Sequence, residues 1–248
     1  MTQDTRSTSR KEQGFTLVEL SIVLVIIGLI VAGVLVGQDL IKGARIRATV
    51  TQIQQFDAGI GAFRVKYDAI PGDILSTTAN AYGLSNVGGD NDGQIEDDSN
   101  NVPITNYGGE AIYFFPHLSD AEMIPGDYDE TETTAGFGFP ESRLKKGGYI
   151  PTSIGMILYY FLGLTDTQTI DAAVAEGAIL TPEEAFSIDN KLDDGVPNAG
   201  TVLAVTAINT VDTTTGTASC LNNSVSPNVY RLANGTISCQ LQIRASGS

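Results

Sequence analysis

The chain has 248 residues and a formal charge of −15, from 14 basic and 29 acidic residues. Only 17% of the residues are charged and 42% are hydrophobic, so the composition predicts a folded core rather than a disordered acidic tail. The acidic balance argues against nucleic acid and anionic membrane surfaces as direct partners, because both require clustered Lys and Arg. With one histidine, His117, and two cysteines, neither a zinc site nor a Ser-His-Asp enzyme is expected.

An apolar segment follows a short polar N-terminus. Residues 15–36 read FTLVELSIVLVIIGLIVAGVLV and contain one charged side chain, Glu19. A helix of this length spans ~33 Å, about the thickness of a bilayer core. Arg6, Arg10 and Lys11 precede it and favour a cytoplasmic N-terminus. A secretory signal peptide is the alternative, but its apolar region is shorter, about 7–15 residues, so a retained membrane helix is favoured.

The charge of Glu19 is costly inside this segment, about 2.5–3.5 kcal/mol on insertion scales. Either Glu19 lies within reach of the lipid headgroups, or it pairs with a positive group supplied later by processing or assembly. The apolar segment alone leaves both interpretations open.

Residues 11–19, KEQGFTLVE, resemble the processing motif of prepilin-type proteins, the type IV pilins and type II secretion pseudopilins. The resemblance implies that a membrane peptidase cuts after Gly14 on the cytoplasmic side and methylates Phe15, the new N-terminal residue. It also implies that Glu19 neutralises the amine of a neighbouring subunit in a filament. Cutting after Gly14 creates a cationic amine one helical turn from Glu19, and a buried pair of this kind specifies register more than it adds stability.

The helix is expected to continue beyond the membrane, because the first proline is Pro71. Apolar residues fall on one helical face at Ile46, Val50, Ile53, Ile60, Phe63 and Tyr67. Many family members have a proline within the apolar segment, where this chain has Gly28, Gly33 and Gly37. We therefore predict a leader peptide (1–14), a spine helix (15–67, transmembrane over 15–36) and an acidic extracytoplasmic head (68–248).

In the head, Ser119 followed by Glu122 has capping-box spacing and predicts a short helix starting there. Residues 181–184, TPEE, predict a helix that ends near Leu192. Predicted strands cover 154–162, 201–209, 229–233 and 236–243, with Asn234-Gly235 as a hairpin turn between the last two. The predicted fold is α+β, with the long N-terminal helix packed on an antiparallel sheet, and it resembles the α/β roll of pilins.

Cys220 and Cys239 enclose a short loop near the C-terminus. An exported domain meets an oxidising compartment, so a disulfide is expected, and closing such a loop contributes ~3 kcal/mol. Two separate buried thiols are the alternative. The pair resembles the C-terminal disulfide loop of many type IV pilins.

Residues 88–98, GGDNDGQIEDD, resemble part of an EF-hand loop. Asp90, Asp92, Glu96 and Asp98 are the candidate Ca²⁺ ligands, although a complete ligand set is missing and a solvated acidic loop is the alternative. No other cofactor is expected. A second acidic cluster, Asp189, Asp193 and Asp194, is expected to mark a turn, with calcium binding as the alternative that the resemblance implies, because pseudopilins bind calcium in acidic C-terminal loops.

The sequence as a whole predicts a structural subunit of a type IV pilus-like filament, not an enzyme. A type II secretion pseudopilin is one alternative, and a single-pass, calcium-dependent binding domain is another. The expected partners are a prepilin peptidase/methylase, other copies of the chain, minor pilins and the bacterial inner membrane. The chain is expected to span that membrane once before assembly and to enter an extracellular or periplasmic filament afterwards.

Overall fold

The computed structural model describes residues 16–85, 89–96, 109–132, 135–163, 177–207, 210–212 and 219–246. The chain divides into two compact units, Met1–Gly43 and Ala44–Ser248, which are described separately below. Gly14 and Phe15 lie outside the described residues.

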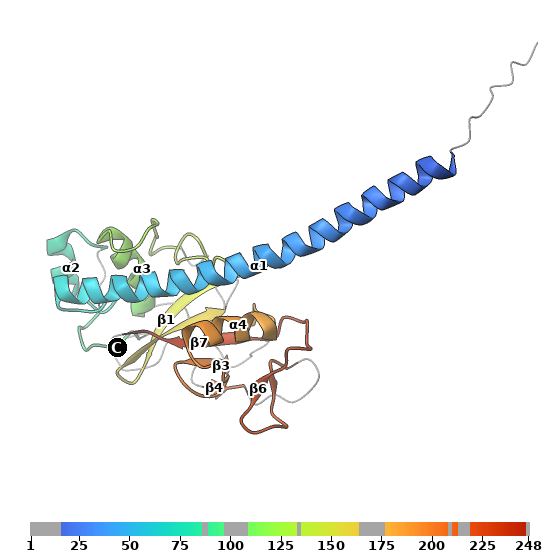
Figure 1. The fold of residues 1–248 in the computed structure, drawn as a ribbon. Coiled ribbons are helices and arrows are strands. Elements are labelled where there is room, and N and C mark those ends of the chain that lie inside the picture. The colour runs from blue at the N-terminus through green and yellow to red at the C-terminus, as the bar shows by residue number, and fades with distance from the viewer. Residues whose placement is uncertain are drawn as a thin grey trace, which may run out of the picture. The chain divides into compact units, whose positions relative to one another are not determined.

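In the first unit, the described residues form the N-terminal part of helix α1, whose bounds are Leu17–Tyr67 (Figure 1). Their large aliphatic side chains are exposed, with Leu17 89%, Leu29 75% and Leu40 70% accessible. Among the described residues, α1 is the one helix long and apolar enough to cross a membrane, with a mean hydropathy of 3.0 in its most apolar window. Helical structure suits such a segment because every backbone group inside a bilayer must be satisfied internally.

The second unit contains a five-stranded antiparallel sheet in the order β1-β2-β7-β3-β4. Its strands are β1 (Gly148–Ile154), β2 (Ile157–Gly163), β3 (Val202–Ala207), β4 (Thr210–Val211) and β7 (Gln240–Arg244). A separate pair is formed by β5 (Leu221–Asn222) and β6 (Val229–Tyr230). Together with the long N-terminal helix, these sheets confirm the predicted α+β fold class.

The C-terminal part of α1 forms one wall of the core of this second unit. The Phe56 ring lies 5.1 Å from the ring of Tyr149 on β1 and 5.3 Å from that of Phe115 in helix α3 (Gly109–Asp120), both edge-on. Asp57 accepts hydrogen bonds from the Tyr160 hydroxyl on β2 and from Ser246 after β7. The six residues of the predicted apolar stripe are all buried, so the stripe is the core-facing side of α1 in this unit.

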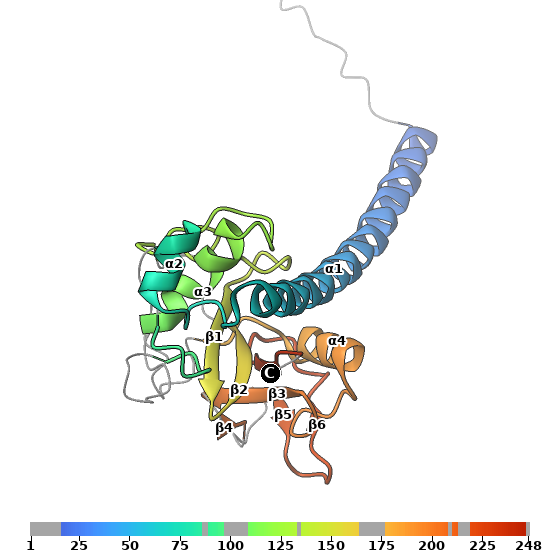
Figure 2. The same cartoon turned by 90° about the vertical axis from the view of Figure 1, so that its left-hand side faces the viewer.

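The described residues of the second unit contain three further helices: α2 (Ser76–Tyr82), α3 (Gly109–Asp120) and α4 (Pro182–Leu192). Helix α3 packs on β1, whereas α4 packs on β3 and β6 (Figures 1 and 2). The prediction for α4 is confirmed. Thr181 is the N-cap, Pro182 occupies the first turn, and Glu184 completes a capping box.

Two local predictions for the head are wrong. No helix begins at Ser119, which lies in the last turn of α3 (Gly109–Asp120). The positive φ of Glu122, 59°, does not allow the helix to continue. The Asn234-Gly235 hairpin does not form, since β7 pairs with β2 and β3 while β6 pairs with β5. Asn234 instead donates to the Ser219 carbonyl and the Ser238 hydroxyl.

Two strand predictions also need correction. The segment predicted as a strand over 154–162 contains a turn at Gly155 and Met156 that joins β1 to β2. The predicted strand over 236–243 begins only at Gln240, and Ile237 is 56% exposed. The hairpin therefore lies at Gly155, between β1 and β2, and not at Asn234-Gly235, where the sequence predicted one.

The disulfide between Cys220 and Cys239 is formed, as predicted, and both residues are buried. The loop that it closes contains the β5–β6 pair. Cys239 also exchanges backbone hydrogen bonds with Leu180, directly before α4. The disulfide thus joins the small sheet to the segment that leads into α4.

Candidate functional sites in the N-terminal helix and an acidic loop

The start of α1 is closed by a capping box between Thr16 and Glu19. The Glu19 backbone N–H donates to the Thr16 hydroxyl oxygen at 3.2 Å, and the Thr16 backbone N–H donates to Glu19 Oε2 at 2.8 Å. The Thr16 hydroxyl donates to the same oxygen at 2.7 Å. The first bond within the helix runs from the Leu20 N–H to the Thr16 carbonyl, so Thr16 is the N-cap residue.

Glu19 was predicted to have a role in assembly, whereas no role was predicted for Thr16. A signal was nevertheless present, because Thr16 and Glu19 stand three residues apart directly before an apolar run, which is the sequence signature of a capping box. The box accounts for the helical boundary within residues 11–19.

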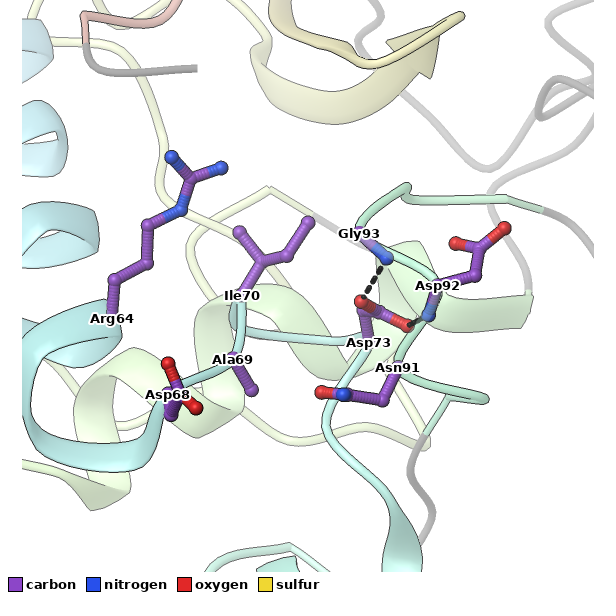
Figure 3. A pocket seen from close by; sticks show the side chains of 8 residues that line it. All are labelled: Arg64, Asp68, Ala69, Ile70, Asp73, Asn91, Asp92 and Gly93. Carbon is purple, nitrogen blue, oxygen red and sulfur yellow. Dashed lines mark hydrogen bonds between the residues drawn. The ribbon is translucent and has the colours of Figure 1, made fainter.

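A second group of functional interest is a cluster of carboxylates after α1. Oxygens of Asp73, Asp90 and Asp92 lie within 4.8 Å of one another. Asp73 accepts backbone hydrogen bonds from Asp92 at 3.2 Å and from Gly93 at 2.9 Å, and its carboxylate points toward that loop (Figure 3). Carboxylate oxygens are the donors that a hard cation such as Ca²⁺ prefers.

The same loop is held from its other side by Glu110, the second residue of α3. Glu110 accepts backbone hydrogen bonds from Asp90 at 3.3 Å and from Glu96 at 3.1 Å. Burial and the charge of Asp73 raise the pKa of Glu110 to about 8. Burial, with the charges of Asp92 and Asp90, raises the pKa of Asp73 to about 6. Negative charge is therefore disfavoured at this cluster when no cation balances it.

The structure groups the predicted metal ligands only in part. Asp90 and Asp92 lie in the cluster, whereas Glu96 is buried and is not one of its three members. Asp98 lies outside the described residues. Asp73 was missed because it belongs to the segment that ends the long helix, and only tertiary folding brings it to the loop.

A cavity of about 330 Å³ adjoins the cluster (Figure 3). It is lined by Arg64, Asp68, Ala69, Ile70, Asp73, Asn91, Asp92 and Gly93. Cationic and anionic groups both line it, so the cavity is polar and opens beside the loop.

Comparison with known families gives one match. A model described as the prokaryotic N-terminal methylation motif matches residues 9–35. The chain carries this methylation motif. The match confirms the resemblance to prepilin-type proteins that residues 11–19 indicated. No curated protein and no solved structure matches the chain.

The methylation motif supports a type IV pilin-like or pseudopilin protein and points to a structural protein rather than an enzyme. It implies processing by a prepilin peptidase and assembly into pilus-type filaments. Together, the motif and the apolar N-terminal helix fit membrane anchoring before assembly.

The second acidic cluster holds a turn. Oxygens of Asp189, within α4, and of Asp193 and Asp194, just after it, lie within 4.8 Å of one another. The buried Asp189 accepts a hydrogen bond from the Tyr230 hydroxyl at 2.8 Å, and Asp193 accepts one from the Thr201 backbone N–H. These contacts fasten the end of α4 to β6 and to the start of β3.

His117 is a buried structural residue. Its Nδ1 accepts the Gly72 backbone N–H at 2.9 Å, and its Nε2 lies 3.1 Å from the Ser85 carbonyl oxygen. Burial lowers the pKa of His117, which favours the neutral ring that these two contacts require. The ring fixes the chain segment that leads to Asp73.

The raised pKa of Glu110 predicts a stability that depends on pH when divalent cations are removed. Between its ordinary pKa of 4.5 and about 8, the folded state binds more protons than the unfolded state. The free energy of unfolding is therefore expected to fall as pH rises through this window.

Denaturant unfolding of the detergent-solubilised chain in EDTA, at pH 5 to 8, measures this effect. Asp73 contributes to the fall of the unfolding free energy only up to about pH 6. Glu110→Gln is therefore expected to make the unfolding free energy nearly independent of pH between pH 6 and 8. Glu122→Gln removes an exposed carboxylate and serves as the control. An unchanged slope in Glu110→Gln would contradict this assignment.

Proposed function

We propose that the chain is a structural subunit of a type IV pilus-like filament, cleaved after Gly14, methylated at Phe15 and assembled through α1. The observation that carries this proposal is the methylation motif over residues 9–35, which includes most of the exposed apolar part of α1. In this proposal residues 1–14 are the leader, 15–67 the spine with its membrane span at 15–36, and 68–248 the head.

The distribution of side chains on α1 supports assembly through this helix. Large aliphatic side chains from Leu17 to Ile41 are exposed in the chain, and they occupy every side of the helix rather than one stripe. Such a surface is compatible with lipid on all sides and equally with neighbouring helices on all sides. The proposed filament core replaces the lipid around each α1 with copies of α1.

Processing would supply the positive charge that the Glu19 carboxylate needs as a partner. The new amine at Phe15 is cationic, and a desolvated carboxylate is stabilised by an opposite charge within hydrogen-bonding distance. We propose that the Glu19 carboxylate binds the amine of a neighbouring subunit and so sets the axial register. Before assembly, the N-terminus lies in the cytoplasm and the head lies outside the inner membrane.

The Cys220–Cys239 disulfide favours a pilus over a secretion pseudopilus, because it resembles the C-terminal loop of many type IV pilins. Filaments sheared from cells provide the test of the proposed function. Mass spectrometry of the sheared subunit is expected to show a chain that starts at Phe15 and carries one added methyl group. A chain retaining residues 1–14, found only in the membrane, would contradict the proposal.

We also propose Ca²⁺ as the ion that the Asp73, Asp90 and Asp92 cluster would hold, and this convergence of oxygens is the observation in its favour. Calcium binding to the folded state alone is expected to raise the unfolding free energy, by about 2.7 kcal/mol at one hundred times the dissociation constant. Thermal unfolding with and without CaCl₂ measures the effect.

The matched variants for the calcium experiment are Asp92→Asn, within the cluster, and Asp127→Asn, an exposed acid elsewhere. The first is expected to lose the calcium-dependent rise in melting temperature, whereas the second keeps it. Equal responses of the two variants would reject a calcium site at this cluster.

A further inference from the structure

The capping box uses only one of the two oxygens of the Glu19 carboxylate. Oε2 accepts both the backbone N–H and the hydroxyl of Thr16, at 2.8 and 2.7 Å. In the part of the chain that the structure describes, Oε1 accepts no hydrogen bond. Thr16 therefore occupies one oxygen and fixes the orientation of the other.

We propose that Thr16 is a positioning residue for filament assembly: its hydroxyl holds Glu19 Oε2, which leaves Oε1 as the acceptor for the cationic amine of a second copy. This inference rests on the proposed function. A Glu side chain has several rotatable bonds, and two hydrogen bonds to one oxygen remove much of that freedom before the partner arrives. The amine then meets a carboxylate that is already oriented, so less conformational entropy is lost on assembly.

The Thr16 hydroxyl has two separable roles. As an acceptor, it caps the helix through the Glu19 backbone N–H at 3.2 Å. As a donor, it binds the Glu19 carboxylate. Glycine is about as good an N-cap residue as threonine but has no hydroxyl, so Thr16→Gly largely retains helix initiation and removes the donor.

Three variants of Thr16 separate positioning from helix capping. Thr16→Ser keeps the hydroxyl, Thr16→Gly keeps the N-cap preference without it, and Thr16→Val keeps the shape of the side chain without it. Each variant is co-expressed with the unchanged chain. The measurement is the ratio of variant to unchanged subunit in sheared filaments, normalised to the cleaved subunit in the membrane by mass spectrometry. Normalisation removes any effect of Thr16 on the peptidase, since only processed subunits are compared.

Thr16→Ser is expected to enter filaments at the ratio of the unchanged chain. Thr16→Gly and Thr16→Val are expected to enter about tenfold less, the factor associated with loss of one hydrogen bond to a charged group. A glycine variant that enters normally, or a serine variant depleted as strongly as valine, overturns the positioning role. If the unchanged chain itself forms no filaments, the proposed function fails, and this inference fails with it.

Discussion

Replacing Gly14 with valine is expected to leave the leader on the chain and to abolish filaments. The proposed cleavage is at the bond after Gly14, and a stiff β-branched side chain there fills space beside the scissile carbonyl. The unprocessed chain has no amine at Phe15 and keeps the polar residues 1–14 ahead of α1. Both changes oppose withdrawal of the helix from the membrane into a filament.

The measurement for Gly14→Val is the intact mass of the membrane-bound chain, together with the yield of sheared filaments. Gly28→Ala is the matched control. It changes a glycine within α1 where an added Cβ meets no atom within 4 Å in the structure. The control is expected to be processed normally. A Gly14→Val subunit that begins at Phe15 would show that the peptidase does not depend on this glycine.

The features that the sequence predicts well are local. The apolar run, the basic N-terminus and the processing motif all lie within about three dozen residues, and the methylation-motif match covers the same region. The start of α4 was predictable for the same reason, because Thr181, Pro182 and Glu184 satisfy the first turn of the helix without help from distant residues. The capping box of Thr16 and Glu19 is local in the same sense, because the two residues stand three positions apart.

The features that the sequence does not predict depend on distant pairing. Asn234-Gly235 has the composition of a hairpin turn, but β7 pairs with β2 and β3, whose contacts bury Leu241 and Ile243. Burial of a strand between two others outweighs a turn preference of two residues. Thr236 likewise binds the Asn234 side chain rather than opening a strand.

The acidic cluster shows the same limit. Asp90 and Asp92 are close in sequence, and both were predicted as ligands. Asp73 comes from the turn that follows α1, and Glu110 comes from the start of α3. They reach the loop because the contact of His117 with Gly72 and the core hold these two segments together. The pKa of a carboxylate depends on such neighbours, so neither raised pKa was visible in the composition.

Glu19→Gln is expected to permit cleavage after Gly14 while reducing filament yield by about tenfold or more. Glutamine keeps a side-chain oxygen for the capping box, because both Glu and Gln serve at that position. It lacks the charge that would neutralise the amine of the neighbouring subunit, and a buried charge left without its partner costs several kcal/mol. The neutral side chain also lowers the cost of residing in the bilayer, so the variant favours the membrane pool over the filament.

The matched control for Glu19→Gln is Asp39→Asn, which removes one exposed negative charge elsewhere on α1. Mass spectrometry gives the cleaved fraction, and shearing followed by quantification gives the filament yield for both variants. Loss of filaments in both would indicate a general charge effect on α1, and normal filaments in Glu19→Gln would eliminate the ion pair. Loss in Glu19→Gln alone, with normal cleavage, places the requirement on the carboxylate that Thr16 holds. With that outcome, the axial register of the filament depends on a single acid of the apolar helix, Glu19. The many acidic residues of the head then take no part in setting the register.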